Sequence, residues 1–143
     1  MKSTLASILV TCIIASSALA QKDIPNILTE GLNALQNTGG KAAVAVWHKG
    51  SPMENNASAT ASNERFLAEI EGDYGKMVGF ELIRIVPLSP SCEWVYIVIK
   101  YEKGPVYGAF NCYKGSKGWV IPTYGLHTRA SEVLPINLLS GPN

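Results

Sequence analysis

The sequence predicts an α+β fold, in which N-terminal helices pack on a curved antiparallel sheet of about four strands. Apolar residues recur at spacings of three and four between Asp23 and Gln36, which favours a helix. Residues 93–113 are rich in β-branched and aromatic side chains on both sides of the sequence Glu-Lys-Gly-Pro, which is typical of a β-hairpin. Helical patterns therefore precede strand patterns, as in a roll with helices on one face of a meander.

The 143 residues and their 47% hydrophobic content are enough for one domain with a real core. The first 20 residues have the pattern of a signal peptide, with Lys2, an apolar run and the small-residue sequence Ala18-Leu19-Ala20. We therefore expect residues 1–20 to be removed near Ala20, leaving one α+β domain over residues 21–143 that is periplasmic or secreted. The apolar run is short for a membrane span, so no transmembrane segment is expected in the mature chain.

The charge balance bears on the partners of the mature chain. The sequence holds 12 Lys and Arg and 11 Asp and Glu residues, and removal of Lys2 with the signal peptide leaves 11 of each sign. A net charge near zero argues against a nucleic-acid partner and against general attraction to anionic membranes.

The helical region contains one ambiguous segment. Residues 41–48 combine alanines, which favour a helix, with valines that would also suit a strand, and we prefer the helix. A polar loop over residues 49–61 follows. The next helix is expected to be capped by Thr60 or Ser62 and to end at Gly72 and Gly75.

Three stretches are expected to form the sheet, namely a strand over residues 78–86, the hairpin, and a last strand over residues 118–123. The sequence Lys-Gly-Ser-Lys-Gly over residues 114–118 predicts the turn before the last strand. Pro122 cannot donate a backbone hydrogen bond, so the last strand should be an edge strand or carry a bulge.

Placing Lys103 and Gly104 at the tip of the hairpin pairs Tyr101 with Val106. One face is then apolar and predicts the core, with Val95, Ile97, Ile99, Tyr101, Val106, Gly108, Phe110 and Cys112. The opposite face is aromatic but also polar, and its best candidates for a binding or interface role are Trp94, Tyr96, Tyr107, Asn111 and Tyr113. Three interpretations of this strip stay open: a homodimer interface, a site for a small apolar ligand, or a surface covered by the C-terminal tail.

Two cysteines, Cys92 and Cys112, remain after export into an oxidising compartment, and a disulfide between them is the preferred prediction. The ideal register sets Cys112 opposite Val95, so the bridge requires a bulge or bend near Cys92. Two free thiols are the alternative.

A family resemblance rests on four short stretches: residues 74–83 (YGKMVGFELI), 101–105 (YEKGP), 110–114 (FNCYK) and 118–119 (GW). Together with the order of elements, they resemble exported bacterial members of the NTF2-like (cystatin-like) superfamily over Asp23 to about Pro135. The resemblance implies a cone-shaped roll with a pocket between helices and sheet, often dimeric through the outer face of the sheet. The superfamily includes both enzymes and binding modules, so it does not assign an activity.

No catalytic or metal-binding motif is evident. His48 and His127 lack metal-ligand spacing, and neither a cofactor nor a metal is expected. The sequence therefore favours a non-enzymatic binding or scaffolding module. The alternative is a pocket enzyme of the NTF2-like type with isomerase- or hydratase-like acid/base chemistry on a small apolar molecule, for which Glu81, Tyr74 or Tyr101 would have to lie in the pocket.

Overall fold

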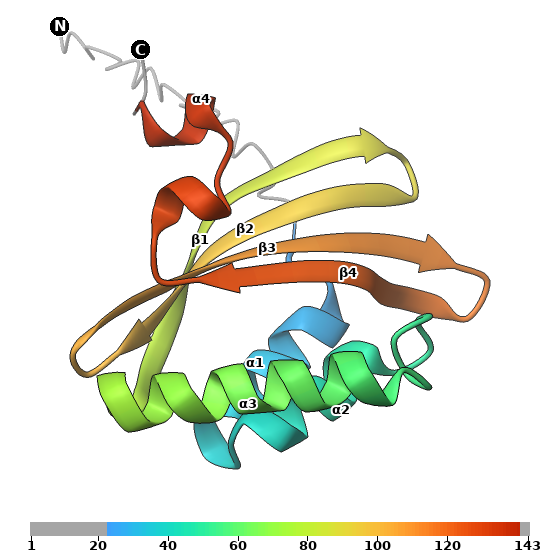
Figure 1. Cartoon of the computed structure of the whole chain (residues 1–143). Helices are drawn as coiled ribbons and strands as arrows, with labels where there is room; N and C mark the ends of the chain where they lie inside the picture. The colour runs from blue at the N-terminus through green and yellow to red at the C-terminus, as the bar shows by residue number, and fades with distance from the viewer. Residues whose placement is uncertain (1–22, 141–143) are drawn as a thin grey trace, which may run out of the picture.

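A computed structural model of the chain describes residues 23–140 (Figure 1). The predicted signal peptide lies outside the described residues. The described chain runs, in order, through α1 (Asn26–Asn37), α2 (Gly40–His48), α3 (Ala57–Tyr74), β1 (Met77–Ser89), β2 (Cys92–Tyr101), β3 (Gly104–Gly115), β4 (Gly118–His127), the 3-10 helix η1 (Ala130–Glu132) and α4 (Ile136–Leu139).

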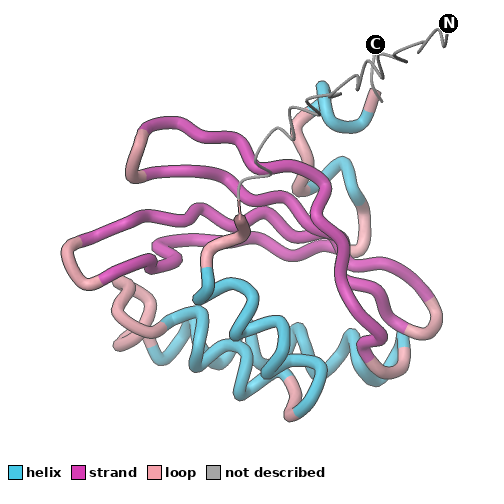
Figure 2. Tube along the Cα trace, turned by 180° about the vertical axis from the view of Figure 1, so that it is seen from behind, coloured by secondary structure: helices cyan, strands magenta, loops and turns pink. Residues whose placement is uncertain are grey.

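The architecture has two layers, and it confirms the predicted α+β class. The four strands form an antiparallel meander in the order β1-β2-β3-β4. Helices α1, α2 and α3 all cover one face of this curved sheet, while η1 and α4 lie on the other side (Figures 1 and 2). We call the face towards the three long helices the inner face and the opposite one the outer face.

The helices follow the predicted pattern except at the start of α3. The ambiguous segment is helical, as preferred, and forms α2. Helix α3 begins at Ala57, earlier than Thr60 or Ser62 would place it, because the side chain of Asn56 accepts a hydrogen bond from the Ala59 N–H at 3.0 Å and caps the helix. Gly75, with φ of 82°, ends it.

The space between helices and sheet is filled by side chains. Trp47 is fully buried, its ring meets Phe110 edge-on at 5.1 Å between centroids, and its Nε1 donates to the Leu28 carbonyl at 3.3 Å. Helix α1 approaches so closely that a Cβ added at Gly31 would overlap the Trp47 indole ring. The region in which the family resemblance implies a pocket is therefore mostly packed core.

The hairpin has the predicted faces but a register shifted by two residues. Tyr101 pairs with Gly104, so that Glu102 and Lys103 form the tip. The end of α3 holds this tip, because the Lys103 N–H donates to the Tyr74 carbonyl at 2.9 Å and a Cβ at Gly104 would lie 2.8 Å from the Tyr74 ring. A shift by an even number of residues leaves every side chain on its predicted face.

The last strand is longer than predicted, and the tail that follows it packs on the sheet. Strand β4 continues to His127 and is an edge strand, as Pro122 indicated, with a register irregularity opposite Asn111 and Tyr113. The tail then turns back along the outer face (Figure 1). Leu134 in the tail is only 8% exposed, yet it is not part of the main core cluster, so it is buried on the outer side of the sheet.

Candidate functional site

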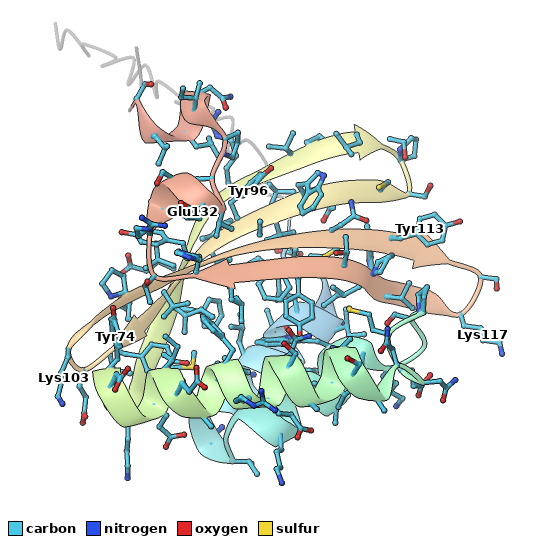
Figure 3. The ribbon with its side chains drawn as sticks, in the orientation of Figure 1. Tyr74, Tyr96, Lys103, Tyr113, Lys117 and Glu132 are labelled. Carbon is cyan, nitrogen blue, oxygen red and sulfur yellow. The ribbon has the colours of Figure 1, made fainter. Side chains whose placement is uncertain are left out.

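The five residues of the aromatic strip lie on the outer face, on strands β2 and β3. In the observed register Trp94 is opposite Asn111, and Tyr96 is opposite Ala109. Tyr113, at the far end, is 46% exposed, whereas the other four are half-buried. Figure 3 shows Tyr96 beside the turn that carries Glu132, and Tyr113 near the β3–β4 hairpin.

A groove of about 380 Å³ lies next to this strip, between β2, β4 and the tail. Its floor has small residues, since Ala109 and Gly125 are neighbours across β3 and β4. A Cβ added at Gly125 would meet no atom within 4 Å, which shows that the groove is open above it. The residues that line the groove are Trp94, Tyr96, Ala109, Thr123, Tyr124, Gly125, Leu126, His127, Glu132 and Val133.

Trp94 and Tyr96 form one wall of the groove. They are two residues apart on β2, and their rings are nearly parallel, with 6.2 Å between centroids and 18° between planes. Partial burial raises the pKa of Tyr96, because the phenolate form loses hydration there. The pair thus presents flat, neutral aromatic surface to the groove.

The structure bears on the three interpretations of the strip. The tail covers part of it, because Leu134 is buried on the outer side and Val133 lines the groove beside Trp94 and Tyr96. Tyr113 and the groove itself remain accessible. Sequence reasoning missed Gly125, Glu132 and Val133, because they come from the unexpected extension of β4 and from a tail whose path no local pattern shows.

The predicted disulfide between Cys92 and Cys112 is wrong, because within residues 23–140 both cysteines are free thiols. Cys92 pairs with Tyr113, and Cys112 pairs with Glu93, so the two cysteines occupy alternate positions that project to opposite faces. The Asn111 amide contacts Cys92 Sγ at 3.7 Å on the outer face, while Cys112 is fully buried. Burial, then the neighbouring Glu93 and Cys92, raise the pKa of Cys112 to about 12.

The residues needed by the pocket-enzyme alternative do not form a common site. Glu81 is exposed on the outer face and forms a salt bridge with Lys100 at 2.8 Å, whereas Tyr101 is on the inner face. Tyr74 packs at the end of α3 against the hairpin tip. Glu93, in contrast, is a buried acidic residue, with 1% of its surface exposed. It lies on the inner face, and the alternation along β2 was a signal from which this position could have been predicted.

His48 is the centre of a polar network between α2, α3 and β4 that sequence reasoning did not foresee. Its Nε2 lies 3.2 Å from both the Tyr124 hydroxyl and the Asn63 amide nitrogen, and its Nδ1 lies 3.1 Å from Thr60 Oγ1. The Asn63 amide nitrogen can only donate, which makes Nε2 an acceptor and favours the tautomer with the proton on Nδ1, next to Thr60 Oγ1. Burial lowers the pKa of His48, although the Met53 backbone and Glu64 oppose this effect.

No family model, curated protein or solved structure matches this chain. Within residues 23–140, no helix is both long and apolar enough to cross a membrane. The same part of the chain contains no cluster of three or more His, Cys, Asp or Glu side chains that would suit a metal ion.

Proposed function

We propose that this protein is an exported, non-enzymatic binding module whose outer-face groove binds a small ligand with a flat apolar ring. The observation that carries the proposal is the parallel pair Trp94 and Tyr96 beside a groove with a small-residue floor. Aromatic walls offer large apolar contact area and favour offset stacking with another ring.

The size and chemistry of the groove support this class of ligand. Its volume of about 380 Å³ lies in the range of sites for small molecules. Thr123, His127 and Glu132 also line it and supply polar groups for the edge of a ring. A planar molecule that is apolar on its faces and polar at its edge matches this arrangement better than a uniformly apolar one.

Indole is a suitable probe for this groove. Cyclohexanol, a saturated ring of similar size, is the control ligand. Binding of both is followed by the amide chemical shifts of the isotopically labelled protein. Indole should shift the amides of Ala109, Thr123 and Gly125 in a saturable way, and cyclohexanol should bind much more weakly. Gly125→Ala should weaken indole binding several-fold, because its methyl group narrows the groove. The matched control is Gly72→Ala, where an added Cβ also meets no atom within 4 Å but lies on α3.

Indole shifts confined to other residues would refute the groove. Equal binding of indole and cyclohexanol would contradict the preference for flat rings. Unchanged indole binding by Gly125→Ala would contradict the claim that indole lies over Gly125 at the floor of the groove.

A homodimer through the same face is the second candidate, favoured by the exposed Tyr113 at the end of the strip. A two-fold contact through tyrosine and tryptophan would remove this apolar surface from water. Sedimentation velocity at increasing concentration should then show a dimer, which Tyr113→Glu should dissociate and the exposed helix variant Ala68→Glu should not. A monomer at every concentration contradicts the dimer and leaves the ligand groove untouched, because Tyr113 does not line it.

Export is proposed from the signal-peptide pattern alone. The intact mass of the secreted protein should correspond to a chain that begins at Gln21. A mass that includes Met1 would contradict it.

A further inference from the structure

The register of the sheet fixes which side chains surround the floor of the outer-face groove. Tyr96, Ala109 and Gly125 form one row across β2, β3 and β4. Along β4, Thr123 and His127 flank Gly125 on the same face, because every second residue of a strand projects to the same side. Two residues of a strand span about 7 Å, so a ring that lies over Gly125 has the His127 side chain beside it.

The two nitrogens of the His127 ring have different roles. The Arg129 backbone N–H donates to His127 Nδ1 at 2.9 Å. Because Nδ1 accepts this hydrogen bond, the neutral ring carries its proton on Nε2, the nitrogen at the outer end of the side chain. Within residues 23–140, Nε2 makes no hydrogen bond. His127 is half-buried and lines the groove, so it supplies one N–H donor there.

The tail supplies an acceptor to the same groove. Glu132 lines it from the turn beside Tyr96 (Figure 3), and 47% of the Glu132 side chain is exposed. Its Oε1 accepts from the Arg129 guanidinium at 2.9 Å, whereas Oε2 makes no hydrogen bond within the described part of the chain. Arg129 therefore contacts both groups, His127 through its backbone and Glu132 through its side chain. Because this salt bridge balances the charge of Glu132, the pair favours a neutral ligand over an ion.

We propose that the groove selects a planar cyclic amide, a ring in which a carbonyl group is next to an N–H group. His127 Nε2–H donates to the ligand carbonyl, and the Glu132 carboxylate accepts from the ligand N–H. The faces of the ring lie against Trp94 and Tyr96. A cyclic amide suits this site because it places one acceptor and one donor on neighbouring atoms of a flat ring. The inference rests on the proposed function, since it names the class of ring that the same groove binds.

Three probes of similar size separate the two hydrogen bonds. Oxindole is a cyclic amide with both groups, N-methyloxindole keeps only the carbonyl, and indole keeps only the N–H. Their binding is followed by the amide chemical shifts of Ala109, Thr123 and Gly125. Oxindole should bind about tenfold more tightly than N-methyloxindole, in line with the strength of a hydrogen bond to a charged group. It should also bind several-fold more tightly than indole, because indole has no carbonyl for His127.

Two variants assign each hydrogen bond to its residue. Glu132→Ala should weaken oxindole about tenfold and also weaken indole, but leave N-methyloxindole unchanged, because this probe has no N–H. His127→Phe keeps a ring in place of the imidazole and should weaken oxindole and N-methyloxindole several-fold, but not indole. Glu69→Ala, at an exposed position on α3, should change none of the three affinities.

The outcomes distinguish this inference from the proposed function on which it rests. If indole shifts the groove amides but oxindole and N-methyloxindole bind the wild type equally, the cyclic amide is overturned and the groove for flat rings stands. Unchanged oxindole affinity in folded Glu132→Ala would overturn the cyclic amide in the same way. If none of the three probes shifts these amides, the groove and the cyclic amide are both overturned.

Discussion

The two faces of the sheet are built from the same strands but are covered by different segments of the chain. On β2, the inner-face residues Val95, Ile97 and Ile99 are fully buried beneath the helices, while the neighbouring outer-face residues Trp94 and Tyr96 are only half-buried under a short tail. These three inner-face side chains have no space beside them in which to accept another group. The difference indicates that the inner face stabilises the fold and that the outer face has apolar surface left for binding.

Two glycines sharpen this comparison, because the same added methyl group should lower stability strongly on the inner side and hardly change it on the outer side. Gly31→Ala would force the Trp47 indole away from its contact with α1, and we expect a loss of about 2 kcal/mol or more in unfolding free energy despite the better helix propensity of alanine. Gly125→Ala should change stability by no more than about 0.5 kcal/mol, because the methyl group enters open space. Urea unfolding measures both. Equal losses would contradict the contrast.

The His48 network predicts a pH effect that originates on the helix side. Burial lowers the pKa of His48 in the folded protein, so the unfolded chain takes up a proton first as the pH falls through about 6.5. The contribution of His48 to stability is therefore complete above that pH and decreases below it. His48→Gln should reduce the loss of stability between neutral and mildly acidic pH, whereas His127→Gln should leave it in place. An unaltered pH profile in His48→Gln would exclude this origin.

The two cysteines offer the mildest test. In the folded protein a thiol-alkylating reagent should modify Cys92 faster than Cys112, because Cys112 is buried and its raised pKa, about 12, leaves almost no thiolate. In denaturant without reductant both should react, as mass spectrometry will show. If neither cysteine reacted in denaturant without reductant, this result would contradict the free thiols and support a disulfide between Cys92 and Cys112.

The sequence predicted the fold class and the faces of the hairpin, because alternation along a strand is a local property. It did not predict the register, since the two-residue shift depends on contacts of the tip with Tyr74 and Lys76, 26 or more residues away. The disulfide failed because it required a bulge or bend near Cys92, whereas β2 and β3 pair without an irregularity and leave Cys92 and Cys112 on opposite faces.

The site was predicted only in part. The aromatic wall was visible in β2, whose residues alternate between the two faces. Gly125 and Val133 reach the groove through tertiary packing of β4 and the tail, and no local pattern encodes this.

Trp94→Ala tests most directly whether stability and binding are separated between the two faces. Its urea unfolding should be compared with that of Phe110→Ala, and its indole titration with that of the wild type. Trp94→Ala should lose about 1 kcal/mol or less and no longer bind indole, whereas Phe110→Ala, from the fully buried inner face, should lose about 3–5 kcal/mol. A loss in Trp94→Ala as large as that in Phe110→Ala, or wild-type indole binding in the folded Trp94→Ala protein, would contradict the account.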